Sequence, residues 1–293
     1  MGNKLISLSK NEELGDIPTH FMKSGSSMPP TERLNTLLEF QRSVLPKQYK
    51  GLDVEYDIWY NTNELRSIRT WLYTDFIGQG IYLRVNTVKI NDRLLTNIGN
   101  DLDQEIDEVR LQKIKEGLTN KYTLGTVTDF HEKVAFPPGS NLLGKNVISW
   151  KRLGELVEEG FVIKPHPITA HVFIAKMKHK YGKENVLDKM SGGHEVLAAC
   201  KELAFCPNSE MGMTGLLLGK KIHSFAIPRT AREKNHLTYE SIYHAIQGKP
   251  SSYKSLARIL SSKRSGIVFP FDTDAKERVQ RYFDNFWDFT IKK

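Results

Sequence analysis

The chain has 293 residues and a formal net charge of +8, and 39% of its residues are hydrophobic. This length fits one large domain or two medium domains, and the apolar fraction is too high for a disordered chain. No stretch approaches the roughly 20 apolar residues of a membrane-spanning helix, and no signal-peptide pattern is present, so we expect a cytoplasmic protein without integral membrane association. Two cysteines are too few for a disulfide framework or a zinc site.

The first part of the chain is irregular and polar, and its patterns favour helices. Apolar residues recur every three or four positions in 31–45, which predicts a helix, and 63–76 is interpreted as a second one. Residues 81–90 alternate and are β-branched, which predicts a strand. Residues 101–117 are acidic at their start and basic near their end, an order that favours a third helix because it suits the helix dipole. A short strand is expected over 5–9.

From residue 133 onward, strand patterns alternate with helix patterns. Strands separated by single helices predict βαβ units and a parallel sheet, with a ligand crevice at the carboxyl ends of its strands. The domain boundary is expected near residue 130, and an amphipathic last helix is expected over 274–289. The expected strands are 133–139, 161–167, 185–188, 203–209 and 221–228, and the expected helices are 149–160, 169–182, 193–202 and 210–220.

Three strand-to-helix junctions contain the residues that are most suited to binding or catalysis. The first junction places Gly139 and Ser140 after a pair of prolines. In the second, His166 lies between two prolines and Lys164 directly precedes the first of them. The third places Ser209 directly before a helix. A helix N-terminus beside a hydroxyl binds anions, so three such turns at one sheet edge would bind a diphosphate or phosphodiester. The alternatives are a rigid turn with a surface histidine at 166 and an ordinary N-cap at 209.

The segment 133–228 resembles the donor-binding half of GT-B glycosyltransferases, above all the capsule-type Kdo and sialyl transferases and the CDP-glycerol transferases. The resemblance rests on three motifs, which are Pro138-Gly139-Ser140, Lys164-Pro165-His166-Pro167 and the run 208–220. Within these motifs, Ser140, Asn208 and Thr214 depart from the family pattern. It implies an α/β fold of GT-B type with two Rossmann-like lobes. Residues 1–131 would bind the acceptor and 132–293 the nucleotide sugar, with the last helix returning to the first lobe.

The resemblance also implies roles in binding the donor. His166, helped by Lys164, would bind a donor phosphate, and the start of the helix after Ser209 would hold another phosphate oxygen. Fixed amides and a cation at the departing phosphate would stabilise its growing charge, so neither a metal nor any other cofactor is required, and the nucleotide sugar is a co-substrate. The implied site is Gly139, Ser140, Lys164, His166, Ser191, Gly192, Gly193, His194, Ser209, Glu210, Met211, Gly212 and Thr214.

An inverting reaction would also need a general base from the first lobe. The candidates are Asp16 and His20, with Asp57 and Asp75 as further ones. The sequence does not distinguish inversion from retention.

The acceptor is predicted from a basic block. Residues 220–264 contain ten Lys and Arg against Glu233 and Glu240, interleaved with tyrosines. This suits phosphate contacts and base stacking, so the leading hypothesis is a hydroxymethylated base in DNA, as for bacteriophage enzymes. The alternatives are a capsule-type enzyme acting on an anionic glycan, an inactive DNA-binding protein of this fold, and a solvated basic surface. The candidate DNA contacts are Arg229, Arg232, Lys234, Lys254, Arg258, Lys263 and Arg264.

Overall fold

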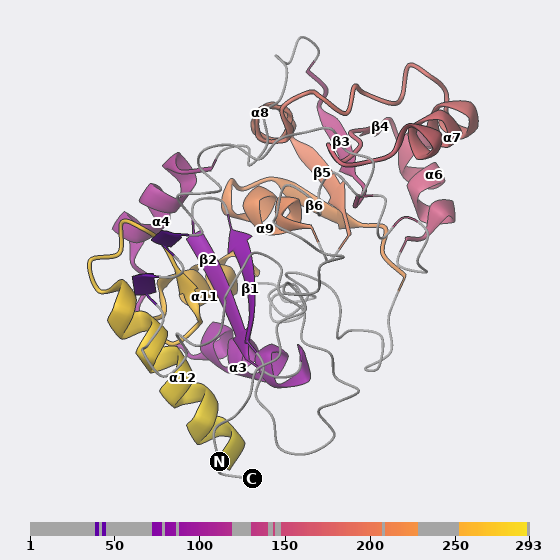
Figure 1. Ribbon diagram of the computed structural model, residues 1–293. Coiled ribbons are helices and arrows are strands. Elements are labelled where there is room, and N and C mark those ends of the chain that lie inside the picture. Colours follow the sequence, from indigo (N-terminus) through magenta and orange to yellow (C-terminus); the bar gives the residue numbers. More distant parts are fainter. Residues whose placement is uncertain are drawn as a thin grey trace. The chain divides into compact units, whose positions relative to one another are not determined.

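The computed structural model forms two compact units (Figure 1). The first unit holds the described residues up to Gly117 together with 252–291, and the second holds those from Leu118 to Ile227. Among the described helices, none is long and apolar enough to cross a membrane. The structure describes residues 39–40, 43–44, 72–77, 80–85, 88–118, 130–139, 143, 148–206, 209–227 and 252–291.

The first unit contains a three-stranded antiparallel sheet in the order β1-β2-β7. Strands β1 (Leu72–Ile77) and β2 (Gly80–Val85) pair along their whole length. Strand β7 (Ile267–Val268) joins β2 from far along the chain. A Cβ at Gly80 would lie 2.5 Å from the ring of Phe269, so the close approach of the segment after β7 requires glycine there.

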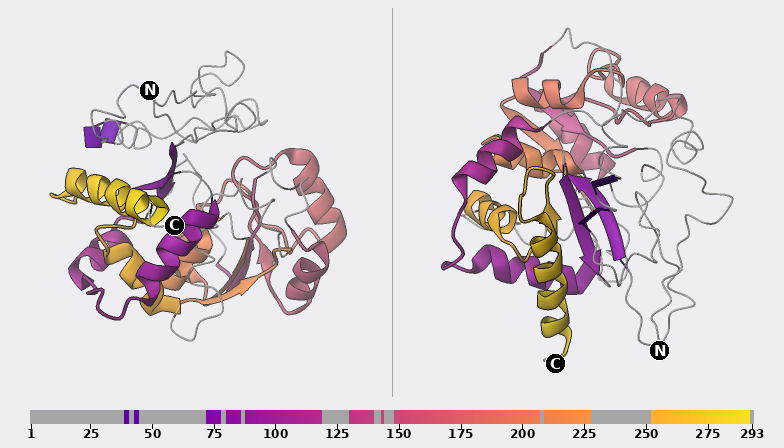
Figure 2. Two further views of the ribbon diagram at one scale, coloured as in Figure 1. Left: turned by 90° about the horizontal axis from the view of Figure 1, so that it is seen from below. Right: turned by 60° about the vertical axis from the view of Figure 1, so that its left-hand side comes forward.

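The described part of the first unit includes four helices with defined bounds. They are α3 (Val88–Asn100), α4 (Glu108–Glu116), α11 (Ser252–Ser261) and α12 (Ala275–Ile291). Helix α11 packs against both α3 and α4 and lies between them (Figure 2). It buries Leu256, Ile259 and Leu260 completely, which gives the first unit its helical core.

A buried ion pair ties three segments of the first unit together. Arg110 on α4 donates from Nε and Nη2 to the two carboxylate oxygens of Asp272, at 2.8 Å each, and both side chains are 4% exposed. Asp272 also accepts the backbone N–H of Phe269 at 2.8 Å, and Arg278 Nε of α12 lies 3.8 Å from it. Because both charges are withdrawn from water, each depends on the other to remain buried.

The second unit is an α/β structure around a four-stranded parallel sheet in the order β4-β3-β5-β6. Alternate residues of β3 enter different apolar clusters. Ala135 packs with residues of the two helices before and after β4, while Val134 and Phe136 pack with the helix before β5. Helices therefore cover both faces of the sheet. The elements are β3 (Lys133–Phe136), α6 (Trp150–Glu158), β4 (Val162–Ile163), α7 (His171–Tyr181), α8 (Gly193–Ala199), β5 (Glu202–Phe205), α9 (Glu210–Leu217) and β6 (Lys221–Ser224).

The predicted α/β class with a parallel sheet is confirmed, and several elements of the first unit differ from prediction. Residues 72–76 of the expected helix 63–76 lie in β1, because pairing with β2 takes up their backbone groups. Residues 88–90 of the expected strand 81–90 begin α3, and α11 was not expected. The expected helix 101–117 begins only at Glu108.

Aspartates explain that late start. Asp101 Oδ1 accepts the backbone N–H of Asp103, and Asp107 Oδ1 accepts that of Arg110 as the N-cap of α4. Such short side chains compete with helical hydrogen bonds. In the second unit, the expected strand 185–188 is a single bridge between Val186 and Ile163. The four described residues of the expected helix 31–45 are helical, and residues 5–9 lie outside the described part.

The predicted division at 131/132 differs from the two units found. It placed residues from 132 onward, apart from the last helix, in the second lobe, whereas β7 and α11 belong to the first unit. The pairing of β7 with β2 accounts for this assignment.

Candidate functional site

The three predicted turns follow neighbouring parallel strands of the second unit. Residues 137–139 follow β3, residues 164–167 follow β4 on one side of it, and the described residues Cys206 and Ser209 follow β5 on the other. Because the carboxyl ends of parallel strands meet at the same edge of a sheet, the turns share one edge, as the sequence predicted. This is the place where open α/β sheets bind ligands.

The turn after β4 holds His166 through two backbone N–H groups. The backbone N–H of Ile168 donates to Nδ1 of the half-buried imidazole at 3.3 Å, and the N–H of Thr169 donates to the His166 carbonyl at 2.8 Å. An Nδ1 that accepts a hydrogen bond leaves the proton of the neutral ring on Nε2. An N–H at that position is a suitable donor to a phosphate oxygen.

Lys164 supports this turn from inside the unit. Its side chain is buried, and Nζ donates to the carbonyl oxygens of Pro165 at 2.7 Å and Lys189 at 3.0 Å. Burial lowers the pKa of this ammonium to about 7, although the carboxylates of Asp188 and Glu195 act to raise it. These contacts suit a positioning role for Lys164, since its nitrogen is already bonded to the backbone on both sides.

The loop 188–194 is joined to the same turn. Besides the bond from Lys164 to the Lys189 carbonyl, Lys189 Nζ donates to the Thr169 carbonyl at 3.3 Å. Gly192 and Gly193 are buried at the start of α8, and Ser191 and His194 are half-buried. Residues 191–194 of the implied donor site are therefore held next to the turn that is expected to bind phosphate.

Two glycines allow α9 to pack closely against β5. A Cβ at Gly212 would lie 2.2 Å from the ring of Phe205, and one at Gly215 would lie 1.8 Å from Cδ2 of Leu203. Ser209 caps the helix, with Oγ accepting the backbone N–H of Met211 at 3.2 Å. The positive end of the α9 dipole consequently lies at the sheet edge, where it favours an anion.

The remaining expected donor contacts of α9 and β3 differ in exposure. Glu210 is mostly buried and Met211 is half-buried, while Thr214 is fully buried and its hydroxyl makes no hydrogen bond. Gly139 is buried and its carbonyl accepts the N–H of Leu143 at 3.2 Å. The side chain of Thr214 therefore faces the interior of the unit.

Several sequence candidates lie outside the described residues, so the structure says nothing of them. They are Asp16, His20, Asp57, Ser140, Arg229, Arg232 and Lys234. In the described part of the chain, no group of three or more His, Cys, Asp or Glu is arranged to hold a metal ion.

Three of the four described candidate DNA contacts have partners within the chain. Arg258 donates to the Gly99 carbonyl at 3.2 Å, and Lys254 is exposed on α11. Lys263 pairs with Asp274 at 2.8 Å, and Arg264 pairs with Asp101 at 3.4 Å. Three of these four side chains therefore contribute contacts within the first unit.

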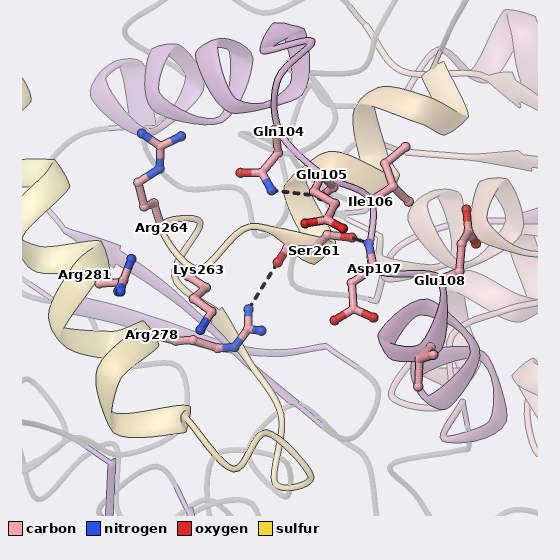
Figure 3. A pocket seen from close by; sticks show the side chains of 11 residues that line it. Gln104, Glu105, Ile106, Asp107, Glu108, Ser261, Lys263, Arg264, Arg278 and Arg281 are labelled. Carbon is pink, nitrogen blue, oxygen red and sulfur yellow. Dashed lines mark hydrogen bonds between the residues drawn. The ribbon is translucent and has the colours of Figure 1, made fainter.

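Sequence reasoning missed a pocket in the first unit (Figure 3). It has a volume of about 500 Å³ and combines Lys263 and Arg264 with Arg278 and Arg281 of α12. The sequence analysis missed the two arginines because it interpreted the amphipathic last helix by its apolar residues alone. Their spacing of three residues, which places both on one face of a helix, was the available signal. The other lining residues are Gln104, Glu105, Ile106, Asp107, Glu108, Val109 and Ser261.

Comparison with known proteins finds distant structural likeness. No protein-family model and no curated protein matches the chain. One similar solved structure is KpsC of Thermosulfurimonas dismutans, a β Kdo 2,7 transferase, with a TM-score of 0.41 and 14% identity over 79% of this chain and 82% of that one. Another is the β Kdo 2,4 transferase KpsC of that organism, with a TM-score of 0.36 and 16% identity over 69% of this chain and 82% of that one. Values this low assign no activity to this chain.

Proposed function

We propose that the chain is a glycosyltransferase that moves a sugar from a nucleotide-sugar donor to a hydroxyl of its acceptor. The observation that carries the proposal is the common edge formed by the turns at 139, 166 and 209. Three features support an anion there: the Nε2–H of His166, the start of α9, and the Lys164 side chain that braces the turn.

In the proposed reaction, the bond between the anomeric carbon and the donor phosphate breaks, and the bonding electrons leave with the phosphate. The acceptor oxygen forms the new bond to that carbon, and its proton passes to a base. The N–H groups at the sheet edge would strengthen their hydrogen bonds as negative charge grows on the departing phosphate. Their positions are set by the fold in advance, which lowers the reorganisation that the transition state requires.

We propose an anionic glycan, as for a capsule-type enzyme, as the acceptor. This choice rests on the resemblance of 133–228 to capsule-type transferases.

Calorimetric titration of the full chain with CMP, CDP, UDP and GDP tests the donor site. We expect one nucleotide to bind, and His166→Ala to weaken its binding about tenfold or more, because a hydrogen bond to a charged group contributes about 1.5–3 kcal/mol. His179→Ala is the matched control, since His179 is exposed on α7. Failure of every nucleotide to bind, or unchanged binding by the His166 variant, would overturn the proposal.

A second pair of variants isolates the contribution of α9. Ser209→Ala and Ser149→Ala each remove an N-cap hydrogen bond, from α9 and α6 respectively, and each should cost about 1 kcal/mol of stability. Only Ser209→Ala should weaken nucleotide binding, because only that helix begins at the proposed site. Equal nucleotide affinity of the two variants would exclude the start of α9 from the site.

Transfer of a labelled sugar distinguishes the acceptors. We expect label on an acidic oligosaccharide and none on duplexes with or without hydroxymethylcytosine. Transfer to the modified duplex alone would refute the glycan proposal and favour the DNA hypothesis.

A further inference from the structure

Helix α7 has one side in the core of the second unit and the other side in solvent. It lies beside α6, where the Tyr181 hydroxyl donates to the Trp150 carbonyl at 3.1 Å (Figure 1). Met177 is buried, and Phe173 and Ile174 pack against the same apolar cluster. The core contacts of these residues fix which side of the helix faces outward.

The outward side of α7, here called the α7 face, has an apolar row between cationic flanks. Val172 is 57% exposed, and the exposed Ala175 lies one turn further along the same row. Lys176 and Lys180, four positions apart, are exposed along one flank, and the half-buried Lys178 lies along the other. Lysine side chains beside apolar surface keep their methylene groups on it and extend the ammonium groups into a polar layer.

Neighbouring acids do not neutralise this face. Residues 160–183 contain no Asp or Glu. Among the described residues, no acid forms an ion pair with a lysine of α7. On the adjacent helix α6, Glu155 and Glu159 pair with Arg152 at 3.1 and 2.8 Å. The positive charge of α7 is therefore available to an anionic partner.

Aromatic rings extend the α7 face toward α6. Nζ of Lys180 lies 5.1 Å from the centre of the Tyr181 ring and 5.9 Å from that of Trp150, and both rings are half-buried. Trp and Tyr side chains combine an apolar ring with a polar group, which suits the boundary between water and lipid.

We propose that the α7 face docks on an anionic lipid surface. The three ammonium groups would contact headgroup phosphates, and Val172 would enter the boundary between headgroups and acyl chains. Deep insertion is excluded because the other side of the helix belongs to the core, so docking depends mainly on charge. Lipid is favoured over nucleic acid because the centre of the face is apolar, and a phosphate backbone gains nothing from an apolar row.

The proposal goes beyond the proposed function and does not depend on it. Helix α7 begins directly after the turn that holds His166, at the carboxyl edge of the parallel sheet, and its 11 residues span about 16 Å. Docking through α7 would therefore hold this edge of the sheet close to the lipid headgroups.

Co-sedimentation of the full chain with two kinds of vesicle tests the charge requirement. One kind contains equal parts of phosphatidylglycerol and phosphatidylcholine, and the other contains phosphatidylcholine alone. We expect at least about tenfold tighter binding to the first kind, because each lysine near an anionic surface contributes about fivefold in affinity. Equal binding to the two kinds, or binding to neither, would overturn the proposal.

A charge variant locates the binding. Lys176→Gln, Lys178→Gln and Lys180→Gln combined should weaken binding about a hundredfold, and glutamine preserves the helix because its helix propensity is close to that of lysine. The matched control loses the same net charge through Lys→Gln at three exposed lysines of the first unit, Lys113, Lys254 and Lys276. It should bind like the wild type. Equal weakening by the two variants would trace the binding to overall charge and overturn the proposal.

Val172 distinguishes lipid from nucleic acid. Val172→Ser should weaken vesicle binding about threefold and Val172→Leu should strengthen it, because apolar area leaves water on docking. Binding of duplex DNA that the charge variant loses and Val172→Ser keeps, without binding of vesicles, would assign the face to nucleic acid and overturn the proposal.

Nucleotide titration of the same variants separates this proposal from the proposed function. If the wild type binds the anionic vesicles and no nucleotide, docking stands and the proposed function fails. If the charge variant binds vesicles like the wild type, docking through α7 is wrong, whatever the nucleotide result.

Discussion

Replacement of Asp272 by alanine tests whether the buried ion pair holds the first unit together. The change removes two 2.8 Å bonds from Arg110 and one from the Phe269 N–H, and it leaves a guanidinium that is 96% buried without its carboxylate. Nη1 of Arg110 already makes no hydrogen bond in the fold. Loss of one partner of such a pair costs about 3–5 kcal/mol.

Hydrogen exchange followed by mass spectrometry can measure this loss in each unit separately. Asp272→Ala should accelerate exchange in peptides of α4 and α12 and leave those of α6 unchanged. Adding Arg110→Met should recover at least about 2 kcal/mol relative to the sum of the single variants, because no unpaired charge then remains buried. Asp103→Ala, at an exposed aspartate, should change stability by less than about 0.5 kcal/mol. Additive single costs, or a loss below about 1 kcal/mol for Asp272→Ala, would refute this account of the network.

Other sites give predictions of the same kind. Gly215→Ala should destabilise the second unit by about 1–3 kcal/mol in urea unfolding, because its Cβ would overlap Leu203. Gly154→Ala is the control, since its Cβ would have ordinary clearance and should cause no such loss of stability. Equal effects of the two variants would contradict the packing argument. Since Lys164 has a folded pKa of about 7 against 10.5 ordinarily, the unfolded chain binds the extra proton between these values. The free energy of unfolding should therefore rise with pH in that window, by up to about 1.4 kcal/mol per unit, relative to Lys164→Met; parallel pH curves would exclude the shift. Burial raises the pKa of the Cys206 thiol, so it should resist a thiol reagent until the chain unfolds, and rapid labelling of the native protein would be incompatible with that.

The second unit could be predicted well because its signals are local. The expected strands are short and bounded by prolines and glycines, and helices lie between consecutive strands, which leaves few alternatives to a parallel sheet. The turns around His166 and Ser209 then follow from strand order. The hydrogen-bond partners of Lys164 could not be predicted: the resemblance implied that it helps to bind a phosphate, and only the fold shows its nitrogen donating to two carbonyl oxygens.

The first unit was harder because its structure depends on distant residues. Residues 72–77 become a strand through pairing with β2, and Phe269 packs beside Gly80 only after the chain has passed through the second unit. Arg110 and Asp272 are 162 positions apart, and no local pattern marks them as partners. The partners of the basic block could not be predicted for a related reason, since the acids that pair with Lys263 and Arg264 lie at Asp274 and Asp101, outside it.

The insertion of β7 beside β2 has a consequence for biosynthesis. During synthesis, residues 72–118 leave the ribosome long before residues 252–291 have been made. The edge of β2 that pairs with β7 therefore stays unpaired until β7 has been synthesised. The second unit, whose strands all lie within 133–224, has no such delay. Maturation should accordingly run from the middle of the chain outward, and truncation before Ile267 should leave a folded centre flanked by an aggregation-prone remnant.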